Sequence, residues 1–183
     1  MANLRRQPSK EETTVKLRSV LFLAVMLLIL VACAEEPPVP EALPTDYNYA
    51  AGELNFSVAL NGVVIQVTDV EVYASDGNIA AGYVYVVPTV NVTNQNEIAV
   101  SNRNFTLVDE YLNEYESWQT NVAFGSALQT MPELVDQGES VSSNHVFIVP
   151  AASLQANLKL RWDSPLTLSR IDIALGDLTA VGQ

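Results

Sequence analysis

From Leu54 onward the sequence alternates apolar and polar residues with a period of two, and this restricts the fold more than any other feature. In the run 54–60 the apolar residues, Phe56 and Val58 among them, fall on one face of an extended strand. Asn61-Gly62 then occupies the position where a tight hairpin turn needs two positive φ angles. The sequence therefore predicts a β-hairpin whose second strand begins at Val63.

The second strand of this hairpin changes phase within the run 63–73. Ile65 and Val67 lie on one face, whereas Val70 belongs to the opposite register. Because an extra residue in one strand shifts the alternation by one, we expect a bulge or bend near Thr68 and Asp69.

The run 82–95 predicts a long strand that crosses the core. Four valines are expected to point inward: Val84, Val86, Val90 and Val92. Four other residues are expected to point outward: Tyr83, Tyr85, Thr89 and Asn91. Pro88 interrupts this run, and a proline cannot donate a hydrogen bond to a neighbouring strand. We therefore expect Pro88 to face a sheet edge or to mark a bulge.

Further strands are expected in four short runs: 104–109, 139–149, 157–162 and 166–175, the last with a phase slip at Ser169 and Arg170. Segment 122–135 is compatible with one turn of helix or a long loop. The pattern predicts an all-β domain, an antiparallel immunoglobulin-like β-sandwich of about seven to eight strands. Phe147 and Trp162 are expected in its core together with the four inward valines.

The amino-terminal segment has the organisation of a secretory signal peptide. Five basic residues precede a run of thirteen apolar residues, Val20–Ala32. As a helix this run would extend only about 20 Å, less than the ~30 Å hydrocarbon core of a bilayer. We therefore expect residues 1–32 to be a cleaved signal peptide rather than a permanent membrane span.

Cys33, the sole cysteine of the chain, follows this apolar run directly. Leu30, Val31, Ala32 and Cys33 resemble the bacterial lipobox, in which the cysteine becomes the acylated amino terminus of the mature protein. A cysteine buried by chance at the end of the signal is the alternative. The pair Arg5-Arg6 is a weaker sorting signal, because the apolar run begins fourteen residues later.

Residues 33–52 are expected to be a lipidated cysteine followed by a disordered linker, and residues 53–183 the folded domain. Four prolines alternate with acidic residues in the linker, a composition that buries little apolar surface. Beyond residue 32 the chain has four basic and nineteen acidic residues, a formal net charge of −15. Because nucleic acids are bound through clustered Lys and Arg, we expect no nucleic-acid partner.

Residues suited to catalysis or metal binding are scarce after residue 33. His145 is the sole histidine and no further cysteine follows, so zinc, copper and haem sites lack their usual ligands. A serine hydrolase would have to use His145, which shares a strand face with Phe147, so we expect it to be structural. We therefore expect no catalytic residues and no cofactor, with a carboxylate-based envelope hydrolase as the alternative.

Two further features bear on binding. Trp118 lies beside a polar loop and is a candidate for a binding surface, whereas Trp162 is expected in the core. The segment 109–116, with Asp109, Glu110, Glu114 and Glu116, could collect calcium. Its spacing matches no alternating-ligand loop, so a solvated acidic rim is the preferred interpretation, and no metal site is predicted.

Three segments carry a resemblance to a known family: GYVYVVPTVNVTNQ (82–95), NFTLVDEYLNEYESW (104–118) and GESVSSNHVFIVP (138–150) followed by LKLRW. They resemble a domain-of-unknown-function family of bacterial lipoproteins with a telokin-like, immunoglobulin-like β-sandwich. The resemblance covers roughly residues 54–175, and Pro88 departs from it where the family has a strand-forming residue. It implies a fold and an extracytoplasmic lipoprotein, and it implies no catalytic residues.

Together these features predict a lipoprotein anchored in the cell membrane on its extracytoplasmic face. Its domain would be a binding or structural module of the cell envelope. The expected partners are the membrane, through acylated Cys33, and an envelope or extracellular protein.

Overall fold

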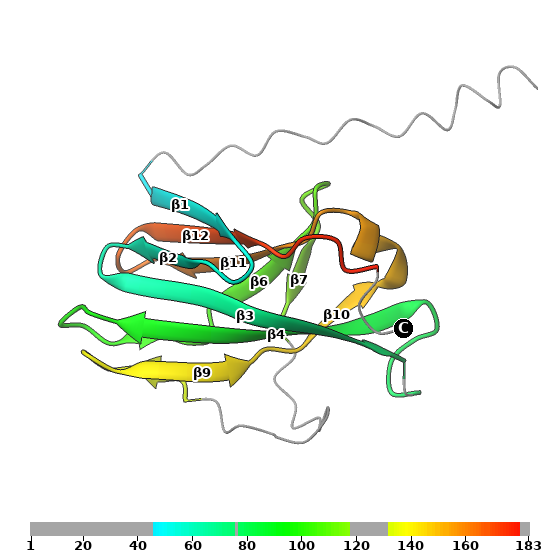
Figure 1. The fold of residues 1–183 in the computed structure, drawn as a ribbon, viewed down its shortest axis with the longest axis horizontal. Coiled ribbons are helices and arrows are strands. Elements are labelled where there is room, and N and C mark those ends of the chain that lie inside the picture. The colour runs from blue at the N-terminus through cyan, green and yellow to red at the C-terminus, as the bar shows by residue number, and fades with distance from the viewer. Residues whose placement is uncertain (1–45, 76, 118–131, 180–183) are drawn as a thin grey trace, which may run out of the picture. The chain divides into compact units, whose positions relative to one another are not determined.

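The computed structural model of the chain describes residues 46–75, 77–117 and 132–179. Within these ranges the chain forms twelve β-strands and one short 3-10 helix, η1 (Ala151–Gln155). Ten of the strands form two packed sheets, and the other two form a separate ribbon (Figure 1). Valine dominates the two longest strands. Branched side chains of this kind pack well on a pleated surface, so the local sequence favours this architecture.

The first sheet has five strands in the order β1-β12-β11-β6-β7. Their bounds are β1 Asn48–Glu53, β12 Ser169–Ala174, β11 Lys159–Ser164, β6 Phe105–Val108 and β7 Glu114–Glu116. The edge strand β1 runs parallel to β12, with Asn48 opposite Ser169, whereas the other neighbours are antiparallel.

The second sheet has the order β10-β4-β3-β2, and β9 also pairs with β4. Their bounds are β10 Phe147–Pro150, β4 Tyr83–Asn94, β3 Val63–Ala74, β2 Ser57–Leu60 and β9 Ser140–Asn144. A separate two-stranded ribbon joins β5 (Val100–Ser101) to β8 (Leu134–Val135). A single β-bridge between Ser117 and Phe147 connects the two main sheets along one side.

The predicted hairpin turn and the predicted bulge are both confirmed. Asn61 and Gly62 have φ angles of 46° and 75°, as the turn between β2 and β3 requires. The pairing of β3 with β4 shifts between Val67 and Asp69. The extra residue moves the later part of β3 to the other phase, which explains the break in its alternation.

Pro88 lies in the middle of β4 and is accommodated by a break in the neighbouring strand. On one side of β4, Thr89–Thr93 pairs with β9 and Tyr83–Val86 pairs with β10, so Pro88 falls between the two. The carbonyl of Pro88 accepts a hydrogen bond from the amide of His145, 3.1 Å away, within that break. Because the nitrogen and carbonyl of one strand residue point to the same side, the missing N–H faces the break.

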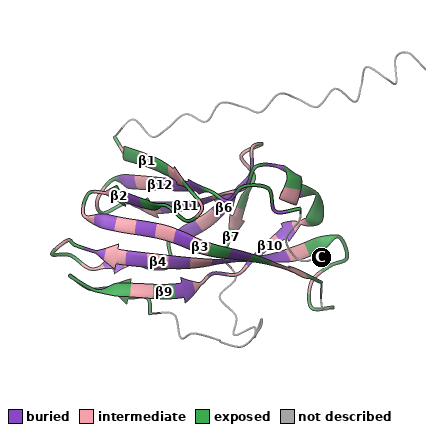
Figure 2. Cartoon of the chain, viewed as in Figure 1, coloured by how far each residue is buried: buried purple, intermediate pink, exposed green. Residues whose placement is uncertain are grey.

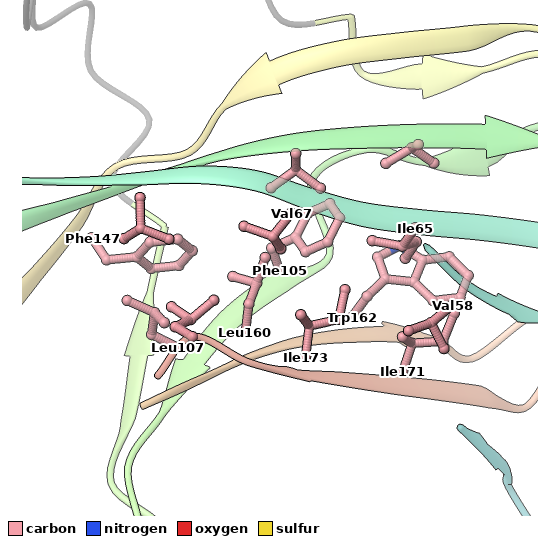
Figure 3. Packing of buried hydrophobic residues seen from close by; sticks show 14 of the residues in the cluster. Val58, Ile65, Val67, Phe105, Leu107, Phe147, Leu160, Trp162, Ile171 and Ile173 are labelled. Atoms are coloured by element: carbon pink, nitrogen blue, oxygen red, sulfur yellow. The ribbon is translucent and has the colours of Figure 1, made fainter. Parts of the chain in front are cut away.

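The hydrophobic core lies between the two main sheets. Figure 3 shows side chains of β3 and β10 meeting those of β6, β11 and β12, with Val67, Phe147 and Trp162 among them. Phe147 is fully buried and Trp162 is 1% exposed, as predicted. Val86, Val90 and Val92 are buried as expected, whereas Val84 is half-buried. Each such large apolar side chain contributes about 1.5–3 kcal/mol through burial.

Two predictions of side-chain orientation are wrong. Phe56 is 66% exposed, because Asn55 has a φ of 71° that ends the extended alternation before β2 begins. Tyr85, expected to face solvent, is fully buried, as is Val87 two residues later. Both point away from the core cluster, so the outer face of β4 is also covered at this position (Figure 2).

The carboxyl-terminal hairpin is also shorter than predicted. Leu166 and Leu168 belong to the turn before β12, where Leu168 has a φ of 46° and Leu166 is 84% exposed. The break in alternation at Ser169 therefore marks the position where β12 begins.

Other strand boundaries differ because pairing across the chain creates or divides strands. The strand predicted over 139–149 is divided into β9 and β10 by residues 145 and 146. Residues 48–52, assigned to the linker, form most of β1, because β12 offers them an edge to pair with. Such short strands raise the total above the seven or eight expected. Across the described residues, no helix has the length and apolar character that crossing a bilayer requires.

Candidate functional site

The two residues singled out for a functional role, Cys33 and Trp118, lie outside the residues that the structure describes. Trp162, expected to be structural, packs in the core and donates a hydrogen bond from Nε1 to the carbonyl of Ser101, 3.1 Å away. The described residues therefore supply sites of other kinds, which are built mainly from polar side chains.

A buried polar cluster joins Asn102, Ser143 and His145 between the sheets. Ser143 Oγ lies 3.1 Å from His145 Nε2, and Asn102 Nδ2 donates to the same oxygen over 3.2 Å. The Ser143 hydroxyl can in turn donate to Asn102 Oδ1, at 3.4 Å. When the Ser143 hydroxyl donates to Asn102, its hydrogen bond with His145 requires a proton on Nε2.

The environment of His145 keeps the ring neutral. Its ring lies 4.5 Å from that of Phe105, and burial lowers the pKa of the imidazole from 6.5 to about 4. Nδ1 has no hydrogen-bond partner in the described structure. Ser143 is fully buried and His145 is 1% exposed, so a substrate cannot reach this serine–histidine pair. The geometry agrees with the structural role predicted for His145.

Asn94 and Asn102 hold the segment that leads into β9. Asn102 Nδ2 donates to the carbonyl of Pro132 over 3.2 Å, and Asn94 Nδ2 donates to that of Val135 over 2.9 Å. Both asparagines are fully buried. Sequence analysis missed this role, because an asparagine at the end of a strand is equally typical of an exposed turn.

Asp109 does not belong to a solvated acidic rim. It is 2% exposed, and its carboxylate accepts four hydrogen bonds, two of them from the amides of Tyr111 and Asn113 at 2.9 Å. The side chains of Asn113 and Tyr115 donate the other two, at 2.9 and 3.0 Å. Asp109 therefore organises the turn between β6 and β7, and this part of the rim interpretation is wrong.

The neighbouring acids point to different partners rather than toward one another. Glu110 accepts a hydrogen bond from Asn157 at 3.0 Å, and Glu114 lies 3.4 Å from Arg161. In the parts of the chain that the structure describes, no group of three or more His, Cys, Asp or Glu side chains is placed to hold a metal ion. The expectation that calcium does not bind segment 109–116 stays a prediction for titration.

A row of ion pairs crosses the outer face of the first sheet. Arg161 binds Asp172 through two hydrogen bonds of 3.0 and 3.2 Å, and Lys159 reaches the same carboxylate at 3.1 Å. Arg170 pairs with Asp163 at 2.8 Å. Arg161 is 3% exposed and Asp172 is 4% exposed, so their charges are largely withdrawn from water.

Pairing of this kind extends to all four basic residues of the domain, since Arg103 lies 3.6 Å from Glu133. The sequence contains these residues, but their pairing depends on which strands are neighbours, for instance Arg161 in β11 facing Asp172 in β12. The domain therefore presents an acidic surface on which each cation has an acidic neighbour.

Two open depressions on the described surface have volumes of about 380 and 350 Å³. The first lies beside η1 and is lined by Leu154, Gln155, Asn157, Gly176, Asp177 and Thr179. There the Thr179 side chain and amide donate to Asp177 and lower the pKa of its carboxyl. The second lies over β6 and β7, between Arg103, Glu116 and Asp163. Both are shallow and mainly polar.

No family model matches the chain, and no curated protein matches its sequence. Solved structures do resemble it. The lipoprotein candidate ycdA from Bacillus subtilis shares 14% identity at a TM-score of 0.52, covering 70% of this chain and 40% of that one.

Two other solved structures match this chain over nearly their whole length. The yjhA protein from Bacillus subtilis shares 15% identity at a TM-score of 0.48, over 68% of this chain and 98% of its own. The secreted protein MPT63 from Mycobacterium tuberculosis shares 15% identity at a TM-score of 0.49, and the match covers 69% of this chain and 98% of MPT63. At such low identity the likeness to ycdA concerns the fold alone, and it agrees with the β-sandwich derived from the sequence.

Proposed function

We propose that this protein is a lipid-anchored module of the cell envelope, held at the extracytoplasmic face of the membrane by Cys33. The observation that carries the proposal is the order of segments: a basic region, a thirteen-residue apolar run, a single cysteine, an acidic proline-rich linker and a β-sandwich. Two or more acyl chains hold a protein stably at a bilayer, because each buried CH₂ contributes about 0.8 kcal/mol.

The comparison with ycdA supports this proposal without carrying it. That protein is a lipoprotein candidate, and its fold resembles this one at a TM-score of 0.52. Membership of the lipoprotein family suggested by segments 82–95, 104–118 and 138–150 forms part of the same proposal. Membership of such a family accounts for the single cysteine, the linker and the sandwich together.

Within this proposal the domain binds a partner rather than catalysing a reaction. Its histidine is enclosed, and the best-placed carboxylates already have partners: Asp109 accepts four hydrogen bonds, and Asp172 pairs with Arg161. A glycosidase-type pair needs two carboxyl groups facing a common cleft. Glu116 and Asp163 line the same depression, but Asp163 is paired with Arg170 at 2.8 Å, and both depressions are open, which suits contact with a macromolecule.

The proposed partner is a protein of the envelope or the extracellular space. The four basic residues of the domain are neutralised locally, which disfavours nucleic acids and favours a partner with basic or neutral contact residues. Trp118, next to the described Ser117, is the first residue to test within such a contact.

Mass spectrometry of the mature protein tests the anchor. The expected result is an amino-terminal Cys33 carrying acyl chains, with residues 1–32 removed, and accumulation of the unprocessed chain in Cys33→Ala. Unmodified Cys33 with the signal still attached would refute the proposal.

Crosslinking in the source cells, followed by affinity purification of the anchored chain, tests the binding role. The Cys33→Ala chain is the matched control, because it retains the domain but cannot be acylated. We expect a protein crosslinked to the anchored chain and absent from the control, and weaker crosslinking in Trp118→Ala. Hydrolysis of envelope polysaccharide by the purified chain would instead favour the carboxylate hydrolase.

A further inference from the structure

Three connections meet at one end of the sandwich, which we call the entry end: the turn 61–62, the loop 95–99 and the turn 165–168. Asn61 Nδ2 donates to Ser169 Oγ over 2.8 Å, and Asn96 Nδ2 donates to the carbonyl of Asn61 over 2.7 Å. The amide of Gln95 also donates to the carbonyl of Gly62, at 2.7 Å. These hydrogen bonds fix the three connections to one another.

The chain enters the domain at this same end. The amide of Asn48, the first residue of β1, donates to the carbonyl of Leu168 over 2.8 Å. Figure 1 shows β1 beginning beside the turn that joins β11 to β12 and beside the hairpin of β2 and β3. The segment that precedes β1 in the sequence is therefore attached at the entry end.

The entry end exposes aliphatic side chains in an otherwise acidic domain. Leu166 is 84% exposed, Ile98 is 65% exposed and Leu168 is 44% exposed. Leu168 also has a φ of 46°, an uncommon conformation for a leucine. Residues 164–168 carry no charge, and the flanking Asp163 and Arg170 neutralise each other at 2.8 Å. The turn itself is thus uncharged, whereas Glu116 lies beside Pro165 and the acidic turn 136–139 is hydrogen-bonded to Asn94 at the same end.

The linker is short relative to the domain. Asp46 lies thirteen positions after Cys33, which allows about 40 Å at the ~3.1 Å per residue of a polyproline-like chain. The twelve residues of β3 alone extend about 40 Å along the sandwich, toward residues 77–82 at the opposite end. A bilayer that holds Cys33 is therefore within easy reach of the entry end, whereas the linker would have to run back along the whole domain to present the other end.

We propose that the entry end rests on the surface of the anchoring bilayer, with Leu166, Leu168 and Ile98 in its interfacial region. This inference rests on the proposed lipid anchor at Cys33. Exposed aliphatic side chains gain free energy when they enter the headgroup and acyl boundary. Glu97 lies next to Ile98, and the domain is acidic overall, so the surface that fits is zwitterionic rather than anionic.

The test uses the acylated chain in phosphatidylcholine vesicles that contain nitroxide-labelled phosphatidylcholine. Because acylation consumes the single native thiol, Leu166→Cys and Ile98→Cys each introduce one site for an environment-sensitive fluorophore. Ala81→Cys, exposed in the loop at the opposite end, is the matched control. All three positions are exposed loop residues, so the labelled variants are expected to fold.

The expected result is blue-shifted emission at positions 166 and 98, with several-fold stronger nitroxide quenching there than at position 81. Vesicles rich in phosphatidylglycerol should weaken that quenching at low salt. Equal quenching at all three positions would refute the inference while leaving the anchor intact. A blue shift without quenching would identify a second copy of the chain as the occupant and refute membrane contact. Failure of acylation, seen by mass spectrometry, would refute both the anchor and this inference.

Discussion

Replacing His145 with glutamine should change how the stability of the domain depends on pH. The imidazole is enclosed against Phe105, its Nε2 is engaged by Ser143, and no carboxylate is hydrogen-bonded to the ring in the described structure. Protonation would therefore place an unpaired charge in the core, which the folded state resists. Glutamine keeps a polar side chain at this position but does not titrate.

The size of the effect follows from the two pKa values. The pKa of His145 is about 4 in the folded protein and 6.5 in the unfolded chain, so the unfolded chain binds more protons between these values. The contribution of neutral His145 is fully present above pH 6.5 and falls as the pH decreases. The wild-type protein should lose about 2 kcal/mol through this residue at pH 5 and about 3 kcal/mol at pH 4. Below pH 4 the folded state also becomes protonated, so the loss levels off within about one pH unit.

Urea unfolding of the chain from Ala34 onward, followed by circular dichroism at pH 7.5, 6, 5 and 4, measures the effect. Carboxylates also titrate in this range, but they do so in both proteins, so the difference between wild type and His145→Gln isolates the histidine. The free energy of unfolding of the variant should fall less steeply with acidification. Parallel pH profiles in the two proteins would refute a buried neutral histidine.

Three further predictions concern packing and charge. Phe147→Ala should lower the free energy of unfolding by about 3–5 kcal/mol with an unchanged urea m-value; a loss below ~1 kcal/mol would contradict its enclosure in the core. In Gly52→Ala the new methyl group would overlap Val58 Cγ2, costing about 1–3 kcal/mol, and Val58→Ala should relieve the clash; additive losses would argue against this contact. Calorimetric titration with millimolar calcium should show no saturable heat, and a saturable transition lost in Asp109→Asn would overturn that expectation.

The parts of the fold that depend on residues adjacent in the sequence could be predicted from the sequence. Asn61-Gly62 has the residue types that a positive-φ turn demands, and the phase change after Val67 marks the bulge. Alternation states which residues share a face, but it does not state what covers that face. Tyr85 illustrates this limit, because its side of β4 is buried rather than solvated.

Features that depend on strand neighbours could not be predicted. Arg161 and Asp172 are eleven residues apart in the sequence and become partners through the register of β11 and β12. Asp109 lies in a segment whose composition is typical of a solvated turn. Its burial depends on the β6–β7 turn closing over it. The enclosed position of His145 was predictable, because the residue alternates with Phe147 and Val149 on one face of its run. Its bonds to Ser143 and Asn102 were not, since they join separate parts of the chain.

The parallel pairing of β1 with β12 sets an order on folding. Asn48 and Ser169 are 121 positions apart, so the edge of the first sheet can form only after nearly the whole domain has been synthesised. Contacts between residues so distant in the sequence form slowly, because closing the long intervening loop costs conformational entropy. The hairpin of β2 and β3, whose strands are joined by two residues, can form much earlier. The first strand of the domain in sequence order, β1, would thus be among the last to reach its native neighbour, β12.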